Sequence, residues 1–146
     1  MMKRLVSALA LAALPLAAHA LEFRSVKETG VALYEAPALN AKKLFVVSRY
    51  YPLEVLSEQK EWARVRDAQG GVAWIPAAAL SLQRMLLVTV DEAEVRDSAA
   101  DSGRVLFRLS KDAVVELVEP PRSGWVKVRH RDGSQGYARI NTLWGL

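Results

Sequence analysis

A repeated pattern of alternating apolar and other residues is what most limits the fold of this chain. Residues 124–140 read GWVKVRHRDGSQGYARI. Val126 and Val128 point to one side of an extended strand, and Trp125, Lys127 and Arg129 point to the other. The letters RDGS then supply turn chemistry, because Gly adopts positive φ freely and Asp or Ser bonds its own backbone. The letters GYARI run back as the partner strand, so the segment predicts a β-hairpin.

The same layout occurs once before, in residues 61–75, which read EWARVRDAQGGVAWI. This alignment places Trp62 with Trp125, Val65 with Val128, Arg66-Asp67 with Arg131-Asp132, Gly71 with Gly136 and Ile75 with Ile140. Segments before the hairpin match at a shift of 62 residues, the Trp residues at 63 and the Gly residues at 65. Such a near-constant period predicts a duplication, and the drift predicts small insertions in turns.

The chain after residue 20 is predicted to be all-β. Strands are expected at residues 21–26, 31–34, 44–49 and 53–57, followed by the hairpin at 62–75 and one helical or 3₁₀ turn at 76–80. The fold class is therefore two tandem small β-barrels, at residues 21–82 and 83–146. A unit of about 60 residues buries only ~60% of its unfolded surface, so we expect the two barrels to pack against each other.

Residues 1–20 have the pattern of a cleavable signal peptide. Lys3 and Arg4 form a basic start, residues 5–14 a short apolar run, and Ala18-His19-Ala20 a small-residue cleavage site. The alternative is an N-terminal membrane anchor, but the run is too short to span a bilayer. We therefore expect an exported, soluble, periplasmic protein, if the source is Gram-negative, with no stable membrane insertion after cleavage.

Composition narrows the function classes further. The chain has no Cys, so its stability depends on packing without disulfides although it is exported. Its formal net charge is +4, and loss of Lys3 and Arg4 would lower this by two, which does not fit a nucleic-acid-binding protein.

Five short alternating strands, a Trp opening the penultimate hairpin, a Gly before its return strand and a terminal single turn resemble the Src homology 3 (SH3) fold. More closely, the chain is similar to the bacterial SH3-like domains of exported proteins, in tandem. In the second copy the resemblance is carried by AEVR at 93–96, GWVKV at 124–128 and DG…GY at 132–137. The resemblance implies non-catalytic binding modules, several of which target cell-wall peptides.

Part of the first copy also resembles the proline-rich-peptide groove of eukaryotic SH3 domains. The matching letters are ALYE at 32–35 and Ile75-Pro76, but Ala36 and Ala79 stand where that groove has Tyr. The second copy has Arg96 and Asn141 where the first has Tyr34 and Pro76. A proline-rich ligand is therefore not expected, since its groove needs a row of aromatic walls.

Catalytic and metal-binding sets are not predicted. His130 is the only His after residue 20, and its Arg neighbours oppose its protonation. One imidazole without Cys does not build a zinc site, so no metal or cofactor is expected. The S-x-x-K spacing of Ser57 and Lys60 brings the two together only on a helix, and here it falls between two strands.

Aromatic and basic residues near the two hairpins are the candidate ligand-binding set: Tyr34, Trp62, Trp74, Arg96, Trp125, Tyr137 and Arg139. The aromatic residues are either core and rim residues or flat apolar contacts for a ligand, with Arg96 and Arg139 fixing a carboxylate. Trp144 is expected to plug the barrel.

Acidic and basic residues also cluster in the second copy. The acidic cluster is Asp91, Glu92, Glu94, Asp97 and Asp101, and the basic cluster is Arg122, Lys127, Arg129, Arg131 and Arg139. They are either solvated or mutually paired faces, or a dipolar groove for a zwitterionic ligand such as a cell-wall stem peptide.

Three functions follow from these patterns. The first is an exported, non-enzymatic binding module that recognises peptidoglycan stem peptide or an envelope protein. The second is a passive scaffold in the envelope, and the third, a cell-wall hydrolase, lacks a recognisable catalytic set. The sequence leaves open whether one barrel binds or both.

Overall fold

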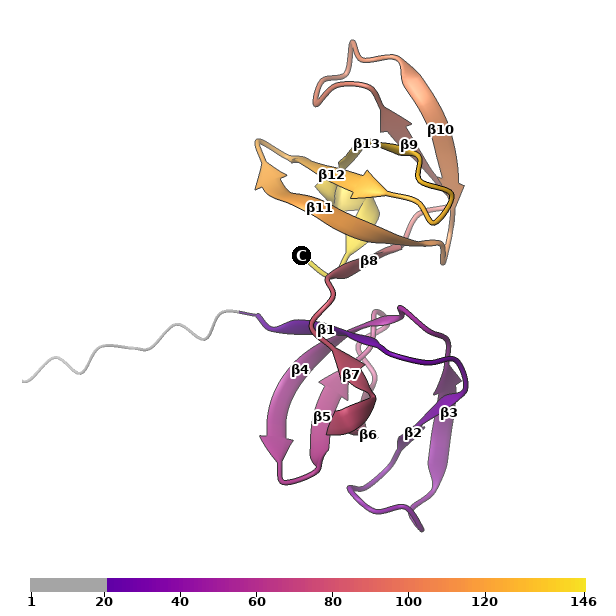
Figure 1. Cartoon of the computed structure of the whole chain (residues 1–146), viewed down its shortest axis with the longest axis vertical. Helices are drawn as coiled ribbons and strands as arrows, with labels where there is room; N and C mark the ends of the chain where they lie inside the picture. The colour runs from indigo at the N-terminus through magenta and orange to yellow at the C-terminus, as the bar shows by residue number, and fades with distance from the viewer. Residues whose placement is uncertain (1–20) are drawn as a thin grey trace, which may run out of the picture.

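Fourteen strands and two single 3₁₀ turns make up residues 21–146, the part of the chain that the computed structural model describes (Figure 1). The strands form two seven-stranded antiparallel sheets, each curled into a small barrel, and the barrels follow each other along the long axis of the molecule. The predicted all-β fold of two tandem barrels is therefore confirmed. The predicted signal peptide lies outside the described residues.

The first barrel contains seven strands and the turn η1. Their bounds are β1 (Phe23–Val26), β2 (Val31–Tyr34), β3 (Lys43–Val47), β4 (Pro52–Gln59), β5 (Trp62–Arg66), β6 (Val72–Pro76), η1 (Ala77–Ala79) and β7 (Leu80–Ser81). The order of the strands in the sheet is β3-β2-β6-β5-β4-β1-β7.

The second barrel repeats this arrangement. Its elements are β8 (Met85–Val88), β9 (Glu92–Arg96), β10 (Val105–Ser110), β11 (Val114–Arg122), β12 (Trp125–Arg129), β13 (Gln135–Arg139), η2 (Ile140–Thr142) and β14 (Leu143–Trp144). The sheet order is β10-β9-β13-β12-β11-β8-β14, so each strand takes the place of the strand seven positions earlier. This one-to-one topology is the structural form of the duplication.

Strand register corrects the predicted alignment of the two hairpins. Trp62 lies opposite Pro76 in β5–β6, and Trp125 lies opposite Arg139 in β12–β13, so Arg139 takes the place of Pro76. The shift stays at 63 residues through the hairpin. The predicted match of Ile75 with Ile140 is therefore wrong, as is that of Pro76 with Asn141.

The glycines of the hairpins misled the alignment because they have different roles. Gly71 lies in the turn, where its N–H donates to the Asp67 carboxylate at 2.8 Å. Gly136 lies within β13, where a Cβ would stand 2.6 Å from the Arg96 carbonyl oxygen, so only Gly allows the strands to approach this closely. The turn glycine equivalent to Gly133 is Gly70, and both have φ of 90°.

Turn hydrogen bonds give the same register as the strands. The N–H of Asp67 and that of His130 close the two turns in the same way, so the predicted pairing of Asp67 with Asp132 is wrong. There is no insertion in this turn. The single extra residue lies in β11, which is nine residues long against eight for β4.

Each barrel has its own core, built from the inward positions of alternating strands. In the first barrel Val26, Leu33, Leu53, Val65 and Ile75 are at most 2% exposed. In the second barrel Val88, Val95, Val115 and Val128 lie at positions equivalent to the first four of these, and Val126 packs with them; all five are at most 1% exposed. Burial of each such side chain stabilises a barrel by roughly 1.5–3 kcal/mol, so the alternation read in the sequence is what closes the barrels.

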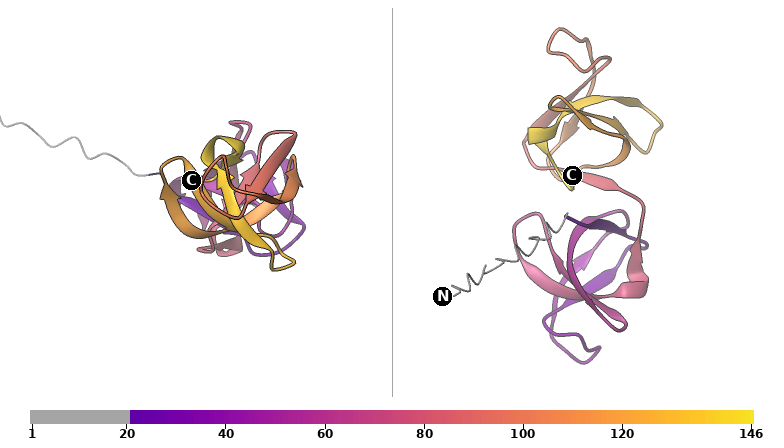
Figure 2. Two further views of the ribbon diagram at one scale, coloured as in Figure 1. Left: turned by 90° about the horizontal axis from the view of Figure 1, so that it is seen from above. Right: turned by 90° about the vertical axis from the view of Figure 1, so that its left-hand side faces the viewer.

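A separate set of side chains joins the two barrels. The Phe23 ring of β1 meets the Trp144 ring of β14 edge to face, with centroids 5.2 Å apart. The Arg84 guanidinium lies 5.5 Å from the Phe23 ring centre and donates to the Gly145 carbonyl at 2.6 Å. Figure 2 shows the C-terminus at the junction of the barrels. The expected plug Trp144 thus packs against the other barrel.

We predict that Phe23→Ala lowers the free energy of unfolding of the full chain by about 3 kcal/mol, because it removes a buried ring from the junction. Leu82→Ala, in the connection but 80% exposed, is the matched control and is expected to change stability by less than about 0.5 kcal/mol. Chemical denaturation measures both, and equal losses in the two variants would contradict this account of the junction.

The junction also predicts that residues 21–82 expressed alone melt at a lower temperature than the full chain, because Phe23 then loses Trp144 and Arg84. Thermal melts followed by circular dichroism make the comparison. Equal melting temperatures would show that the barrels do not stabilise each other.

Candidate functional site

An open groove lies at one end of the first barrel, with a volume of about 320 Å³. Its walls come from four places: Leu39 in the β2–β3 loop, Glu61 before β5, Trp62 and Pro76 at the facing ends of β5 and β6, and Ala78 in η1. Leu39 is 74% exposed. The groove is therefore mainly apolar, with one carboxylate at its edge.

Tyr34 supports the floor of this groove. Its ring meets the Trp62 ring edge to face, with centroids 5.4 Å apart and planes at 88°. Tyr34 is itself only 8% exposed, whereas Trp62 is half-buried and presents part of its indole to the groove. Trp74 lies beside Tyr34 in the sheet and beside Arg64 across β5–β6, two residues before Pro76. The first barrel thus brings three of the predicted site residues together.

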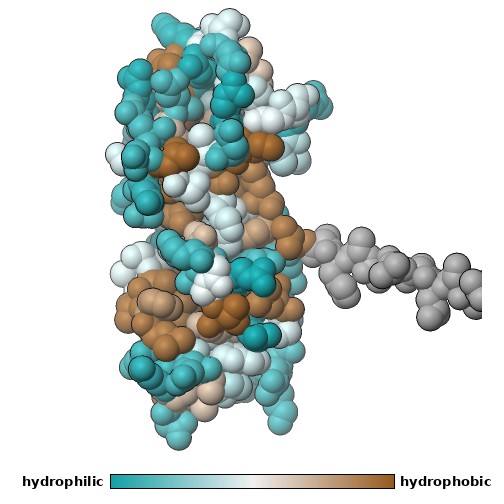
Figure 3. Space-filling model, turned by 180° about the vertical axis from the view of Figure 1, so that it is seen from behind, coloured by the Kyte–Doolittle hydropathy of each residue, from teal (hydrophilic) through white to brown (hydrophobic). Residues whose placement is uncertain are grey.

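Exposed apolar side chains are concentrated on the first barrel. Figure 3 shows hydrophobic surface over much of the lower barrel, where the upper one is mostly polar. The large apolar residues that the first barrel exposes are Leu21, Leu39, Phe45, Val46 and Val72, against Leu106 and Ile140 in the second. The groove is part of this more apolar half of the molecule.

The loop that carries Leu39 has the same hydrogen bonds in both barrels. In the first barrel the backbone N–H groups of residues 35, 38 and 41 donate to the carbonyls of residues 42, 36 and 38, respectively. In the second barrel the N–H groups of residues 97, 100 and 103 donate to the carbonyls of residues 104, 98 and 100, respectively. Every pair is shifted by 62 residues, so Asp101 takes the place of Leu39. Two apolar groove residues, Leu39 and Pro76, are therefore replaced by an acid and a base in the second barrel.

In the second barrel, Asp101 and Arg139 cover the surface that is equivalent to the groove of the first barrel. Arg139 forms an ion pair with Asp101, and its guanidinium carbon stands 4.7 Å from the Trp125 ring centre. Trp125 is only 8% exposed as a result. A cation over an indole face is favourable electrostatically and excludes an apolar ligand from that face. The equivalent Trp residues are thus half-open in the first barrel and covered in the second.

The Arg96 side chain donates hydrogen bonds to the β9–β10 loop of its own barrel. Its guanidinium donates to the carbonyls of Asp101 at 3.0 Å and Gly103 at 2.7 Å, and to the Glu94 carboxylate at 2.5 Å. Tyr137, across β9–β13 from Arg96, lies with its ring centre 5.9 Å from the Lys127 ammonium. The carboxylates that Arg96 and Arg139 contact are therefore the chain's own.

The acidic and basic clusters of the second barrel meet at one ion pair, Arg139–Asp101. Other basic residues pair with carboxylates outside the acidic cluster, Lys127 with Glu119 at 3.4 Å and Arg129 with Glu116 at 3.2 Å. These pairs are partly exposed, so each contributes at most about 1 kcal/mol.

The residues weighed for catalysis lie in turns and strands. Strand β4 extends to Gln59, so Ser57 lies in the strand and only Lys60, with φ of 53°, lies in the following turn; the expectation that the S-x-x-K letters fall between two strands is therefore correct for Lys60 alone. Asp132 accepts the Ser134 N–H at 2.8 Å and lies 3.3 Å from His130, and these contacts lower the pKa of Asp132. Within residues 21–146 no group of three metal-ligating side chains and no helix long and apolar enough to cross a membrane is found.

Leu39, Glu61 and Ala78 are the groove residues that the sequence analysis missed. Leu39 carried a usable signal, since it is the one large apolar residue in the polar loop 37–43. Glu61 and Ala78 became groove residues only when β5, β6 and η1 were placed together.

Two small barrels of this strand order, each with a 3₁₀ turn before its last strand, define a tandem pair of SH3-like domains. Family comparisons match residues 29–81 and residues 89–145, each to a family described as "Bacterial SH3 domain". The chain therefore belongs to the bacterial SH3 domain family and carries two such domains. Domains of this family are typically binding modules, often of extracellular or envelope-associated proteins.

Solved structures with similarity to the chain include NlpC2 and NlpC1 from Trichomonas vaginalis, at 17% and 16% sequence identity and TM-scores of 0.39 and 0.40. The match covers 85% and 88% of this chain and 48% and 47% of those proteins. An NlpC/P60 family protein from Bacillus cereus matches at 14% identity and a TM-score of 0.38, over 84% of this chain and 55% of that protein. The chain thus spans about half the length of these proteins. No curated protein matches it.

Proposed function

We propose that the chain is a non-enzymatic binding module of the cell envelope, and that the groove of its first barrel holds a peptide. The open indole of Trp62 between Leu39 and Pro76 is the observation that carries the proposal. A groove of about 320 Å³ has room for a few small side chains, in the lower range of ligand sites. The occupant we favour is the stem peptide of peptidoglycan, and the alternative is a segment of an envelope protein.

The chemistry of the groove supports a short peptide with an apolar and a basic part. Trp62 and Pro76 offer rigid flat surfaces, which give contact area at a small loss of side-chain entropy. Glu61 at the edge offers a carboxylate to an amine. A stem peptide combines small apolar side chains with a free amine, so it matches both features.

The periplasm is the compartment this proposal requires, because the wall and its peptides are there. Its support is the sequence pattern of residues 1–20, which favours export and cleavage after Ala20. N-terminal sequencing of the protein recovered from a periplasmic fraction is expected to begin at Leu21.

We predict that the full chain co-sediments with purified sacculi. Trp62→Ala is expected to weaken this binding about tenfold or more, because Trp62 is the largest side chain that lines the groove. Trp125→Ala is the matched control, because its indole is covered by Arg139, and it is expected to bind as the unsubstituted chain does. Depletion of protein from the supernatant measures binding, and circular dichroism verifies that both variants are folded.

Other outcomes of this experiment separate the remaining functions. No depletion by sacculi would exclude the wall, and capture of an envelope protein that Trp62→Ala abolishes would then assign the alternative ligand. If both Trp substitutions lower stability and neither changes binding to any partner, the chain is a scaffold. Turnover of a peptide or glycan substrate by the pure protein would overturn the proposal in favour of a hydrolase.

The double substitution Asp101→Leu with Arg139→Pro gives the second barrel, beside Trp125, the two apolar groove side chains that it lacks, while Gly124 and Asn141 still replace Glu61 and Ala78. Arg139 has φ of −72°, which proline adopts without strain, so the barrel is expected to remain folded. We predict a second binding site for the same peptide, seen as a doubled stoichiometry in isothermal titration calorimetry. An unchanged stoichiometry would show that the ion pair is not what closes the second barrel.

A further inference from the structure

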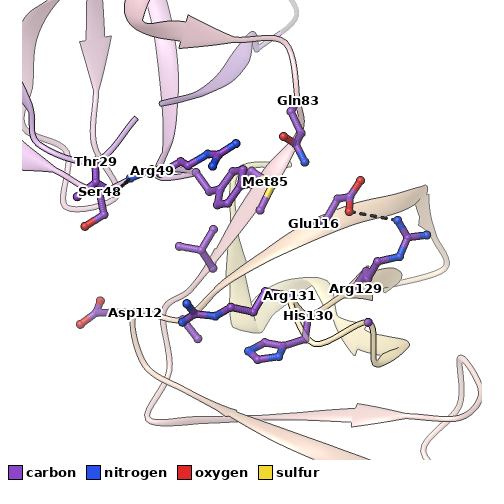
Figure 4. Close-up of a pocket in the computed structure, with 14 residues that line it drawn as sticks. Thr29, Ser48, Arg49, Gln83, Met85, Asp112, Glu116, Arg129, His130 and Arg131 are labelled. Atoms are coloured by element: carbon purple, nitrogen blue, oxygen red, sulfur yellow. Dashed lines mark hydrogen bonds and ion pairs between the residues drawn. The ribbon is translucent and has the colours of Figure 1, made fainter. Parts of the chain in front are cut away.

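A cleft of about 710 Å³ lies between the two barrels (Figure 4). It is separate from the groove at Trp62 and shares no residue with it. The first barrel supplies the turn after β3, the second supplies β11 and the β12–β13 turn, and the connection supplies Gln83. A ligand in this cleft would therefore touch both barrels.

Basic side chains stand on both sides of the cleft. Arg49 comes from the first barrel, and Arg129 and Arg131 come from the second. Arg129 is neutralised by Glu116 at 3.2 Å, the contact drawn dashed in Figure 4. Within residues 21–146, no carboxylate lies within 4.0 Å of the guanidinium nitrogens of Arg49 or Arg131. Two uncompensated guanidinium groups thus line one cavity from opposite walls.

Asp112 is the remaining carboxylate of the cleft. Figure 4 shows the Arg131 side chain extending toward Asp112, but the two do not reach ion-pair distance. Asp112 therefore reduces the positive potential of the cleft without satisfying the donors of Arg131. Its removal should make the cleft more attractive to an anion.

The turn after β3 places the Tyr50 ring beside Arg49 at the wall of the cleft. Tyr50 and Asp112 occupy equivalent turns, in which their N–H groups bond the carbonyls of Val26 and Val88 at 2.8 and 2.9 Å. Both have positive φ, 73° and 70°, a region that bulky residues avoid. The same conformation in both copies belongs to the turn, and in the first copy it places the Tyr50 ring 4.7 Å from the Arg49 guanidinium carbon. The stacking limits the orientations of the Arg49 guanidinium at the wall of the cleft.

We propose that the cleft binds a small molecule with two anionic groups, one held by Arg49 and the other by Arg131. Guanidinium groups match both carboxylate and phosphate oxygens through paired N–H donors, so either anion fits the recognition. The Tyr50 ring and the Met85 side chain give the body of the ligand an apolar wall. Such a ligand would bridge the barrels and fix their relative orientation.

Isothermal titration calorimetry on the full chain tests this with two probes, inorganic pyrophosphate and glutarate, at one fixed salt concentration. Saturable binding of one probe or both is expected, and the tighter probe distinguishes a phosphate from a carboxylate ligand. Arg49→Gln and Arg131→Gln should each raise the dissociation constant about tenfold, as expected for loss of a charge-assisted hydrogen bond. Asp112→Asn should lower it several-fold.

Matched controls separate a site from general electrostatic attraction. Arg64→Gln and Arg122→Gln remove the same charge from exposed positions outside the cleft, one in each barrel, and should change the dissociation constant less than twofold. Trp62→Ala should leave anion binding unchanged, so failure of the peptide groove and failure of this cleft are distinguishable. Tyr50→Asn should weaken binding without lowering the melting temperature, since Asn tolerates positive φ.

Three results would overturn the proposal. The first is that neither probe gives saturable heat at concentrations up to about 10 mM. The second is that the control variants lose as much affinity as the cleft variants. The third is that the amide chemical-shift changes are confined to one barrel. Nuclear magnetic resonance titration of the full chain provides the last readout. The expected result is that the amides of residues 49–50 and of residues 130–133 shift together.

Discussion

Small inward-facing side chains in the last hairpin of each barrel are the constraint on which the structure depends. Ala63 and Ala73 in the first barrel, and Ala138 in the second, are at most 4% exposed and leave room for the Val and Leu side chains of the opposite wall. Gly136 goes further, since any side chain there would collide with the backbone of Arg96. Barrels of this size have little surface to bury, so a loss of close packing at these positions has few compensating contacts.

The two copies share their strand order but differ both inside the barrel, where Ile75 is replaced by Ala138 and Ala63 by Val126, and on the outside. Tyr34, Leu39 and Pro76 of the first barrel correspond to Arg96, Asp101 and Arg139 of the second. These replacements turn an apolar groove into an ion-paired surface over the equivalent indole without disturbing the sheet. A duplicated fold thus presents two surfaces of different chemistry, which is consistent with different partners for the two barrels.

Much of the fold could be predicted from the sequence, because strand alternation, turn residues and the repeat are local patterns. The alignment failed inside the hairpin since Gly71 and Gly136 look alike as letters but serve as a turn residue and as a close-contact strand residue. Tyr34, Trp62 and Arg139 were found from their residue type alone. That Arg139 covers Trp125, and that Arg49 and Arg131 line one cleft, depended on segments far apart in the chain and therefore needed coordinates.

The contact between Phe23 and Trp144 has a consequence for the order in which the chain acquires its structure. It joins the first strand of one barrel to the last strand of the other, whereas the hairpins inside each barrel connect neighbouring segments. Closing so long a loop is entropically unfavourable until each sheet has formed. The barrels should therefore fold separately, and the contact between Phe23 and Trp144 should form last, after the second sheet has closed.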